Sequence, residues 1–140
     1  MTVALLITSV LFTVTLAGHC YVARLLATRL TGSSGVEFIV LCWTLGILHI
    51  TQVGLYAIGF ALGEWLGLGS FEQSVGMTAM DTFYFSLVSF TTLGLGQVFP
   101  TGHLRFIAGF EAFNGFMCIT LSASLVFRWV HGNVGTQPSQ

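Results

Sequence analysis

A short glycine-containing segment holds the residues that could bind an ion. Residues 91–96 read TTLGLG, which places glycine at the alternate positions Gly94 and Gly96. Glycine adopts positive φ without steric cost, so the backbone can alternate between ordinary and left-handed conformations and turn its carbonyl oxygens the same way. Stacked rings of such oxygens from several chains can replace the water around a cation. The hydroxyl of Thr92 adds a further oxygen at the inner end.

The residues before this segment predict a short helix that ends at the carbonyl oxygens. The apolar run 82–90 is too short to cross a bilayer, which takes roughly 20 helical residues. Asp81 is a favourable N-cap residue. The negative end of the helix dipole would face the ion and favour a cation. We interpret this stretch as a re-entrant segment, because non-helical backbone at membrane depth is tolerated only inside protein or along a water-filled path.

Composition places the rest of the chain in a membrane. The chain has 140 residues, of which 54% are hydrophobic and 6% charged, with no lysine, whereas soluble domains carry about 25% charged residues. Three apolar runs are long enough to span a bilayer, at about 2–26, 36–62 and 104–127. The balanced charge and the lack of a basic patch exclude a nucleic-acid partner. We expect an all-α membrane protein in contact with lipid, without a cofactor.

The segment 81–102, DTFYFSLVSFTTLGLGQVFPTG, resembles the pore region of the potassium-channel superfamily, whose signature is TVGYG or TIGFG preceded by threonine and followed by aspartate. The resemblance covers about 36–130 and implies a prokaryotic-type pore module with two transmembrane helices. Residues 1–30 would add a third, N-terminal transmembrane helix. We expect a homotetramer, because one filter strand cannot enclose an ion.

The resemblance implies a position for each part of the pore. The expected parts are an outer helix at 36–63, a turret at 64–80, a pore helix at 81–91, a filter at 92–97, an inner helix at 102–129 and a short cytoplasmic tail at 131–140. Potassium ions would bind to backbone carbonyls of the selectivity filter, formed by Thr92, Leu93, Gly94, Leu95 and Gly96, chiefly to those of the first four. Support for the filter would come from Thr91, Gln97 and Glu111.

Two residues depart from the family pattern. Leu95 stands where most members have tyrosine or phenylalanine, and Gln97 stands where aspartate is usual. Val88 occupies a position where some members place a buried glutamate that contacts this aspartate. The resemblance therefore implies passive permeation of potassium, while these changes motivate a second hypothesis, a weakly selective cation channel.

The third span contains further candidate residues. Gly115 lies about midway along it and is either a gating hinge, as in the resembling channels, or a helix-packing glycine. One turn apart below it, Ile119, Ala123 and Phe127 would share a face that either lines the pore or packs against lipid and protein. Phe127 could form a hydrophobic constriction that gates by dewetting.

Glu111 is an ionisable residue within the third span, which is costly in lipid and so indicates function. We expect it to hydrogen-bond Ser86, Ser89 or Thr91 and to brace the filter; the alternative is a buried carboxylic acid with a purely structural role.

Several polar residues lie in the other spans. For His49 and Gln52 in the second span, interhelical hydrogen bonding is favoured over a pH-sensitive contact. We expect His19, His103 and His131 near the membrane surfaces. No pair of histidines has metal-ligand spacing.

Positive residues predict the orientation in a plasma membrane. Arg24 and Arg29 follow the first span and Arg128 ends the third, so the N-terminus should be outside and the C-terminus cytoplasmic. Because these arginines follow the first run, we expect a retained helix rather than a signal peptide.

Two further classes of function are open. The chain could be a non-conducting subunit whose first helix docks onto another membrane protein. An enzyme would need convergent acid, base or metal ligands, and the sequence has none, so we expect no catalytic activity.

Overall fold

Three long apolar helices and one short helix make up the molecule. The computed structural model describes residues 1–30, 34–72, 77–96 and 98–134. The long helices are α1 (Thr2–Arg29), α2 (Gly35–Trp65) and α4 (Leu104–Val134), and each is long and apolar enough to cross a membrane. The short helix α3 (Ala79–Phe90) has 12 residues. The predicted fold class, three spanning helices plus a re-entrant one, is confirmed.

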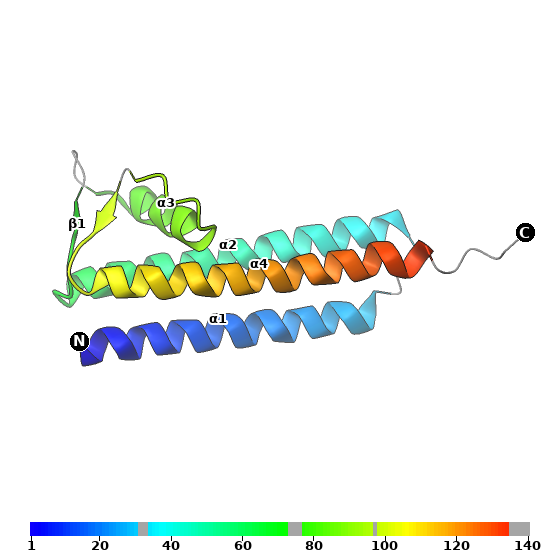
Figure 1. Cartoon of the computed structure of the whole chain (residues 1–140), viewed down its shortest axis with the longest axis horizontal. Helices are drawn as coiled ribbons and strands as arrows, with labels where there is room; N and C mark the ends of the chain where they lie inside the picture. Colours follow the sequence, from blue (N-terminus) through cyan, green and yellow to red (C-terminus); the bar gives the residue numbers. More distant parts are fainter. Residues whose placement is uncertain (31–33, 73–76, 97, 135–140) are drawn as a thin grey trace, which may run out of the picture.

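The pair α2 and α4 separates α1 from α3. α1 and α4 run in the same direction and α2 runs against them, while α3 lies on the opposite side of the pair from α1 (Figure 1). Two short antiparallel strands, β1 (Phe71–Glu72) and β2 (Phe99–Pro100), join the connections on either side of α3. The segment that leaves α2 and the segment that leads into α4 therefore lie side by side, and α3 is in the part of the chain between them.

The start of α3 differs from the expectation. Thr78, rather than Asp81, is the N-cap, and its hydroxyl accepts from the Asp81 amide at 3.3 Å. The Asp81 carboxylate accepts in return from the Thr78 amide at 2.8 Å. This reciprocal capping box needs residues three apart, so the helix begins at Ala79 and Asp81 is its third residue.

α1 packs through a regular stripe of buried residues. The stripe alternates steps of four and seven residues, an 11-residue repeat that stays on one face of a nearly straight helix. Its members are Ala4, Thr8, Thr15, His19 and Leu26. His19, which we expected near a membrane surface, is buried among the helices, with a side chain that is 0% exposed. His19 lies between helices because α2 and α4 offer it polar partners.

Hydrogen bonds between side chains attach α1 to its neighbours. Asn114 on α4 donates to the hydroxyl of Thr15 and, at 3.0 Å, to the Tyr56 hydroxyl of α2. Gln52 on α2 donates to the Thr15 carbonyl oxygen at 3.0 Å. Thr15 therefore receives one hydrogen bond from each of the other two spanning helices.

We expect Thr15→Val to lower the free energy of unfolding by about 1 kcal/mol, because the Asn114 amide loses an acceptor in an apolar surround. Thermal unfolding of the purified protein in detergent measures the change. Thr13→Val, at an exposed position on the same helix, is the matched control. Equal stability of the two variants would contradict this account of how α1 is held.

Candidate functional site

The backbone of the TTLGLG segment alternates in handedness. φ is +59° at Thr92, +60° at Gly94 and +69° at Gly96. The expected alternation at the two glycines is therefore present, and Thr92 extends it by one further step. A threonine pays a steric penalty at positive φ, and non-glycine residues held in this way cluster at functional sites.

Only the part of the segment up to Gly94 is hydrogen-bonded to α3. The Thr92 amide donates to the Ser89 carbonyl at 2.9 Å, and the Leu93 amide donates to the Val88 carbonyl at 2.9 Å. In the described part of the chain, Leu95 and Gly96 make no hydrogen bond. The segment is thus anchored where α3 ends and unbraced further along, and Gln97, expected to support it, lies outside the described residues.

The segment is exposed in a single chain. All residues from 91 to 96 are exposed, and the side chains of Leu93 and Leu95 are 62% and 52% exposed. Behind the segment lies a cavity of about 240 Å³, lined mainly by apolar groups that include Val88, Leu95 and Phe99. In a single copy of the chain, one side of the TTLGLG segment is therefore uncovered, and the other side borders a cavity rather than closely packed side chains.

Glu111 meets α3 at Ser86. Both side chains are fully buried, and the Ser86 hydroxyl lies 2.5 Å from Glu111 Oε1 and 2.8 Å from the Val53 carbonyl oxygen. A hydroxyl has one hydrogen, so when Ser86 donates to Val53 it can only accept from Glu111. In that arrangement Glu111 carries the acid proton and donates it to Ser86, whereas in the other arrangement Ser86 donates to Glu111 Oε1. The neutral acid is the form that burial penalises less.

Of the other two expected partners of Glu111, Ser89 also interacts with its carboxyl group, whereas Thr91 bonds elsewhere. The Ser89 hydroxyl donates to the Ala108 carbonyl oxygen at 3.2 Å, and the Thr91 hydroxyl donates to the Leu87 carbonyl oxygen at 2.8 Å. Glu111 therefore contacts α3 through Ser86 and Ser89 rather than the TTLGLG segment itself.

The C-terminal end of α3 packs against α4 at Gly115. A Cβ at this position would overlap the carbonyl oxygen of Phe90, the last residue of α3. The neighbouring atoms are backbone and cannot move independently, so the close approach requires glycine. Gly115 is thus a packing glycine, one of the two roles expected for it.

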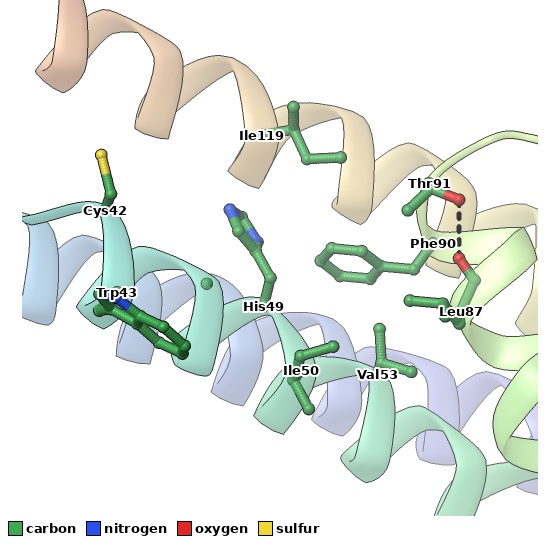
Figure 2. Close-up of a pocket in the computed structure, with 10 residues that line it drawn as sticks. Cys42, Trp43, His49, Ile50, Val53, Leu87, Phe90, Thr91 and Ile119 are labelled. Atoms are coloured by element: carbon green, nitrogen blue, oxygen red, sulfur yellow. Dashed lines mark hydrogen bonds between the residues drawn. The ribbon is translucent and has the colours of Figure 1, made fainter. Parts of the chain in front are cut away.

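The residues expected to follow Gly115 along the pore lie on an uncovered face. Ile119, Ala123 and Phe127 are all exposed in a single chain, whereas Gly115 is buried. Ile119 also borders a cavity of about 550 Å³ together with Phe90 and Thr91 (Figure 2). The upper end of this face therefore lies directly beneath the TTLGLG segment.

A polar cluster between α1, α2 and α4 went largely unpredicted. His49 Nε2 lies 3.0 Å from the Ser122 hydroxyl oxygen of α4, and Gln52 donates to Thr15 of α1. The expected interhelical hydrogen bonding of His49 and Gln52 is confirmed. The sequence signal that was missed is a repeat of polar residues three or four apart in each span: Thr15 and His19, then His49, Gln52 and Tyr56, then Asn114, Cys118 and Ser122.

These features define an integral membrane protein with a re-entrant helix and a carbonyl-lined segment, the architecture of a pore. A family model described as an ion channel matches residues 39–131. The chain belongs to this family of potassium-channel-like pores with two transmembrane helices, and α1 is an additional N-terminal helix. The family is one of channels and not of enzymes, as expected. Searches of curated proteins and of solved structures found no match to the chain.

Removing the Ser86 hydroxyl should destabilise the protein by about 1–2 kcal/mol, because the buried Val53 carbonyl and Glu111 both lose a partner. Glu111→Gln should stay within about 0.5 kcal/mol of the wild type, since an amide N–H can replace the acid proton as donor to Ser86. Thermal unfolding of Ser86→Ala and Glu111→Gln tests both statements, with the exposed Ser124→Ala as control. A loss in Glu111→Gln as large as in Ser86→Ala would mean that the carboxyl group is ionised.

A methyl group at Gly115 should displace the end of α3. We expect Gly115→Ala to lose about 1–3 kcal/mol of stability, the usual cost of overpacking, and to reduce ion flux in liposomes. The matched control is Gly109→Ala on the same helix, where nothing lies within 4 Å of an added Cβ. Wild-type stability and flux in both variants would show that α3 does not depend on this contact.

Proposed function

We propose that four copies of this chain form a potassium-selective channel. The observation that carries the proposal is the alternation of left-handed residues at Thr92, Gly94 and Gly96. Around a fourfold axis, the carbonyl oxygens of Thr92, Leu93, Gly94 and Leu95 form stacked rings that bind potassium, and Gly96 completes the filter. Permeation is passive, with ions displacing one another between adjacent rings.

The exposure of the filter supports the assembly. Two exposed leucines, and a run of carbonyls that accept no hydrogen bond from the described residues, are costly in a lone chain. Neighbouring copies would cover the leucines, while permeant ions would supply partners for the carbonyls. The C-terminal end of α3, tied to the Thr92 and Leu93 amides, adds a negative dipole end that favours a cation.

We assign the parts of the chain on this basis. Residues 1–30 form the N-terminal helix and 36–130 the pore domain, with outer helix 36–63, turret 64–80, pore helix 81–91, filter 92–97 and inner helix 102–129. Arg24, Arg29 and Arg128 cluster at one end of the helices, which supports a cytoplasmic C-terminus in a plasma membrane. Ile119, Ala123 and Phe127 would line the path below the filter.

A weakly selective cation channel is the second candidate. The specific observation in its favour is that Leu95 and Gly96 make no hydrogen bond within the described residues and border an apolar cavity of about 240 Å³. A filter free to adjust its width would discriminate less between potassium and sodium if selectivity depends on a fixed fit.

A non-conducting subunit is less well supported. The polar residues of α1 already bind α2 and α4. A membrane partner would therefore have to recognise the opposite, apolar face of α1, where Val10 and Val14 are exposed.

Flux from liposomes that contain the purified protein tests the proposal. We expect potassium efflux that barium blocks and a sodium flux at least about tenfold smaller, because a carbonyl filter discriminates between the two ions. Gly94→Ala is the matched negative variant, since φ is +60° there and a side chain would strain the backbone.

The outcomes separate the candidates. Equal flux of potassium and sodium would establish the weakly selective channel. An absence of flux from correctly assembled tetramers would contradict both conducting proposals and favour the non-conducting subunit.

A further inference from the structure

Two histidines from different helices meet at one serine in the middle of the membrane-spanning bundle. Ser122 Oγ of α4 lies 3.0 Å from His49 Nε2 of α2 and 3.3 Å from His19 Nε2 of α1. The centroids of the two rings are 5.3 Å apart. Histidine is the side chain that changes charge near neutral pH, so the placement of hydrogens in this group decides its chemistry.

The contacts of Gln52 indicate which ring nitrogen of His19 carries the hydrogen. Its Nε2 lies 3.0 Å from the Thr15 carbonyl oxygen, which can only accept, so this atom is the amide nitrogen. The same nitrogen lies 3.4 Å from His19 Nδ1. An NH₂ group only donates, and its second hydrogen lies between His19 Nδ1 and the Cys118 sulfur, which is 3.7 Å away. The tautomer that suits this donor has His19 Nδ1 as the acceptor and the ring hydrogen on Nε2.

The position of the His19 hydrogen then fixes the hydrogen-bond directions at Ser122 and His49. His19 Nε2–H donates to Ser122 Oγ, and the Ser122 hydroxyl then donates to His49 Nε2. His49 carries its own hydrogen on Nδ1, which makes no hydrogen bond of ordinary geometry among the described residues, although the Gln52 side chain also interacts with this ring. Both rings are neutral in this arrangement, and they are opposite tautomers.

The arrangement can accept one extra proton at His49. A proton on His19 Nδ1 would face the Gln52 NH₂ group and break that contact. A proton on His49 Nε2 requires only that the Ser122 hydroxyl rotate, because its oxygen can accept from both rings while its hydrogen turns to a carbonyl of the preceding helical turn. A second proton is opposed by the first, since the rings are 5.3 Å apart.

Other titratable groups near the pair do not compete for this proton. They are Cys20 on α1, Cys42 and Tyr56 on α2, and Cys118 on α4, whose thiols and phenol contain no basic nitrogen. α3 presents Phe90, which does not titrate, with its ring centroid 5.8 Å from that of His49. Glu111 contacts Ser86 rather than either histidine.

His49 lies close to the end of the proposed filter. It borders the cavity of about 550 Å³ with Phe90, Thr91 and Ile119, and Figure 2 shows the Phe90 ring pointing toward it. Thr91 immediately precedes Thr92, the first residue of the filter. A positive charge on His49 in each of four copies would therefore oppose the entry of cations from below.

We propose that His49 is a proton-binding site and that protonation of His49 reduces cation flux through the pore. Ser122 and His19 position the acceptor nitrogen, and the proton is the ligand. The proposal rests on the proposed channel function for its effect on flux, but proton binding at His49 is independent of conduction.

Potassium flux from liposomes, measured from pH 8.0 down to 4.5, tests the effect. We expect about a tenfold fall, since a unit charge roughly 10 Å from a cation changes its occupancy by about that factor at the dielectric constant typical of protein sites. His49→Gln should abolish the pH dependence, because the amide can accept from Ser122 without gaining charge. His19→Gln should keep it, and the exposed His103→Gln is the matched control.

Nitrogen NMR of ¹⁵N-histidine in the purified wild-type protein tests the site without flux. We expect His19 as the Nε2–H tautomer and His49 as the Nδ1–H tautomer at pH 8.0, with His49 alone of the two becoming doubly protonated on acidification. Protonation of His19 first, or of neither ring, would overturn the proposal.

The flux measurements test whether protonation of His49 regulates the channel. Flux that does not change with pH, that rises on acidification, or that keeps its pH dependence in His49→Gln would each overturn the regulatory role. An absence of flux at every pH would instead contradict the proposed channel function, and the NMR titration would then decide the proton site alone.

Discussion

The requirement that polar groups at membrane depth find partners inside the protein governs this structure. Threonines within the spans satisfy it locally: Thr8 donates to the Ala4 carbonyl and Thr120 to the Phe116 carbonyl, each at 2.7 Å. The TTLGLG segment is the exception, because Leu95 and Gly96 make no hydrogen bond within the described residues. Such a stretch is tolerable in a membrane when ions and neighbouring copies complete it, which is the arrangement that a pore provides.

α4 connects the two sides of the molecule through adjacent residues. Gly115 receives the Phe90 carbonyl of α3, and Asn114 donates to Thr15 of α1. A rotation of α4 would therefore disturb both contacts at once. The N-terminal helix and the end of α3 therefore contact α4 at adjacent residues, although α1 and α3 lie on opposite sides of the α2–α4 pair.

Hydropathy and glycine spacing were enough to predict the spans, the re-entrant helix and the left-handed positions at Gly94 and Gly96. They could not predict the same conformation at Thr92, since threonine disfavours it and only the tertiary setting imposes it. The position of His19 was also out of reach, because an apolar span does not reveal which of its faces meets polar residues of other helices. The N-cap was missed because Asp81 and Thr78 both suit that position, and only their reciprocal bonds distinguish them.

Accounts of potassium selectivity differ on whether a fixed cavity size or the number and field of the carbonyl dipoles decides. This chain helps to separate the two. Its proposed filter keeps the alternating backbone, yet Leu95 cannot donate a hydroxyl hydrogen and an apolar cavity lies behind it. If this filter selects potassium strongly over sodium, the carbonyl oxygens are sufficient for selectivity even where Leu95 and Gly96 make no hydrogen bond to the described residues. If it selects weakly, selectivity depends on hydrogen bonds that hold this part of the filter at a fixed width.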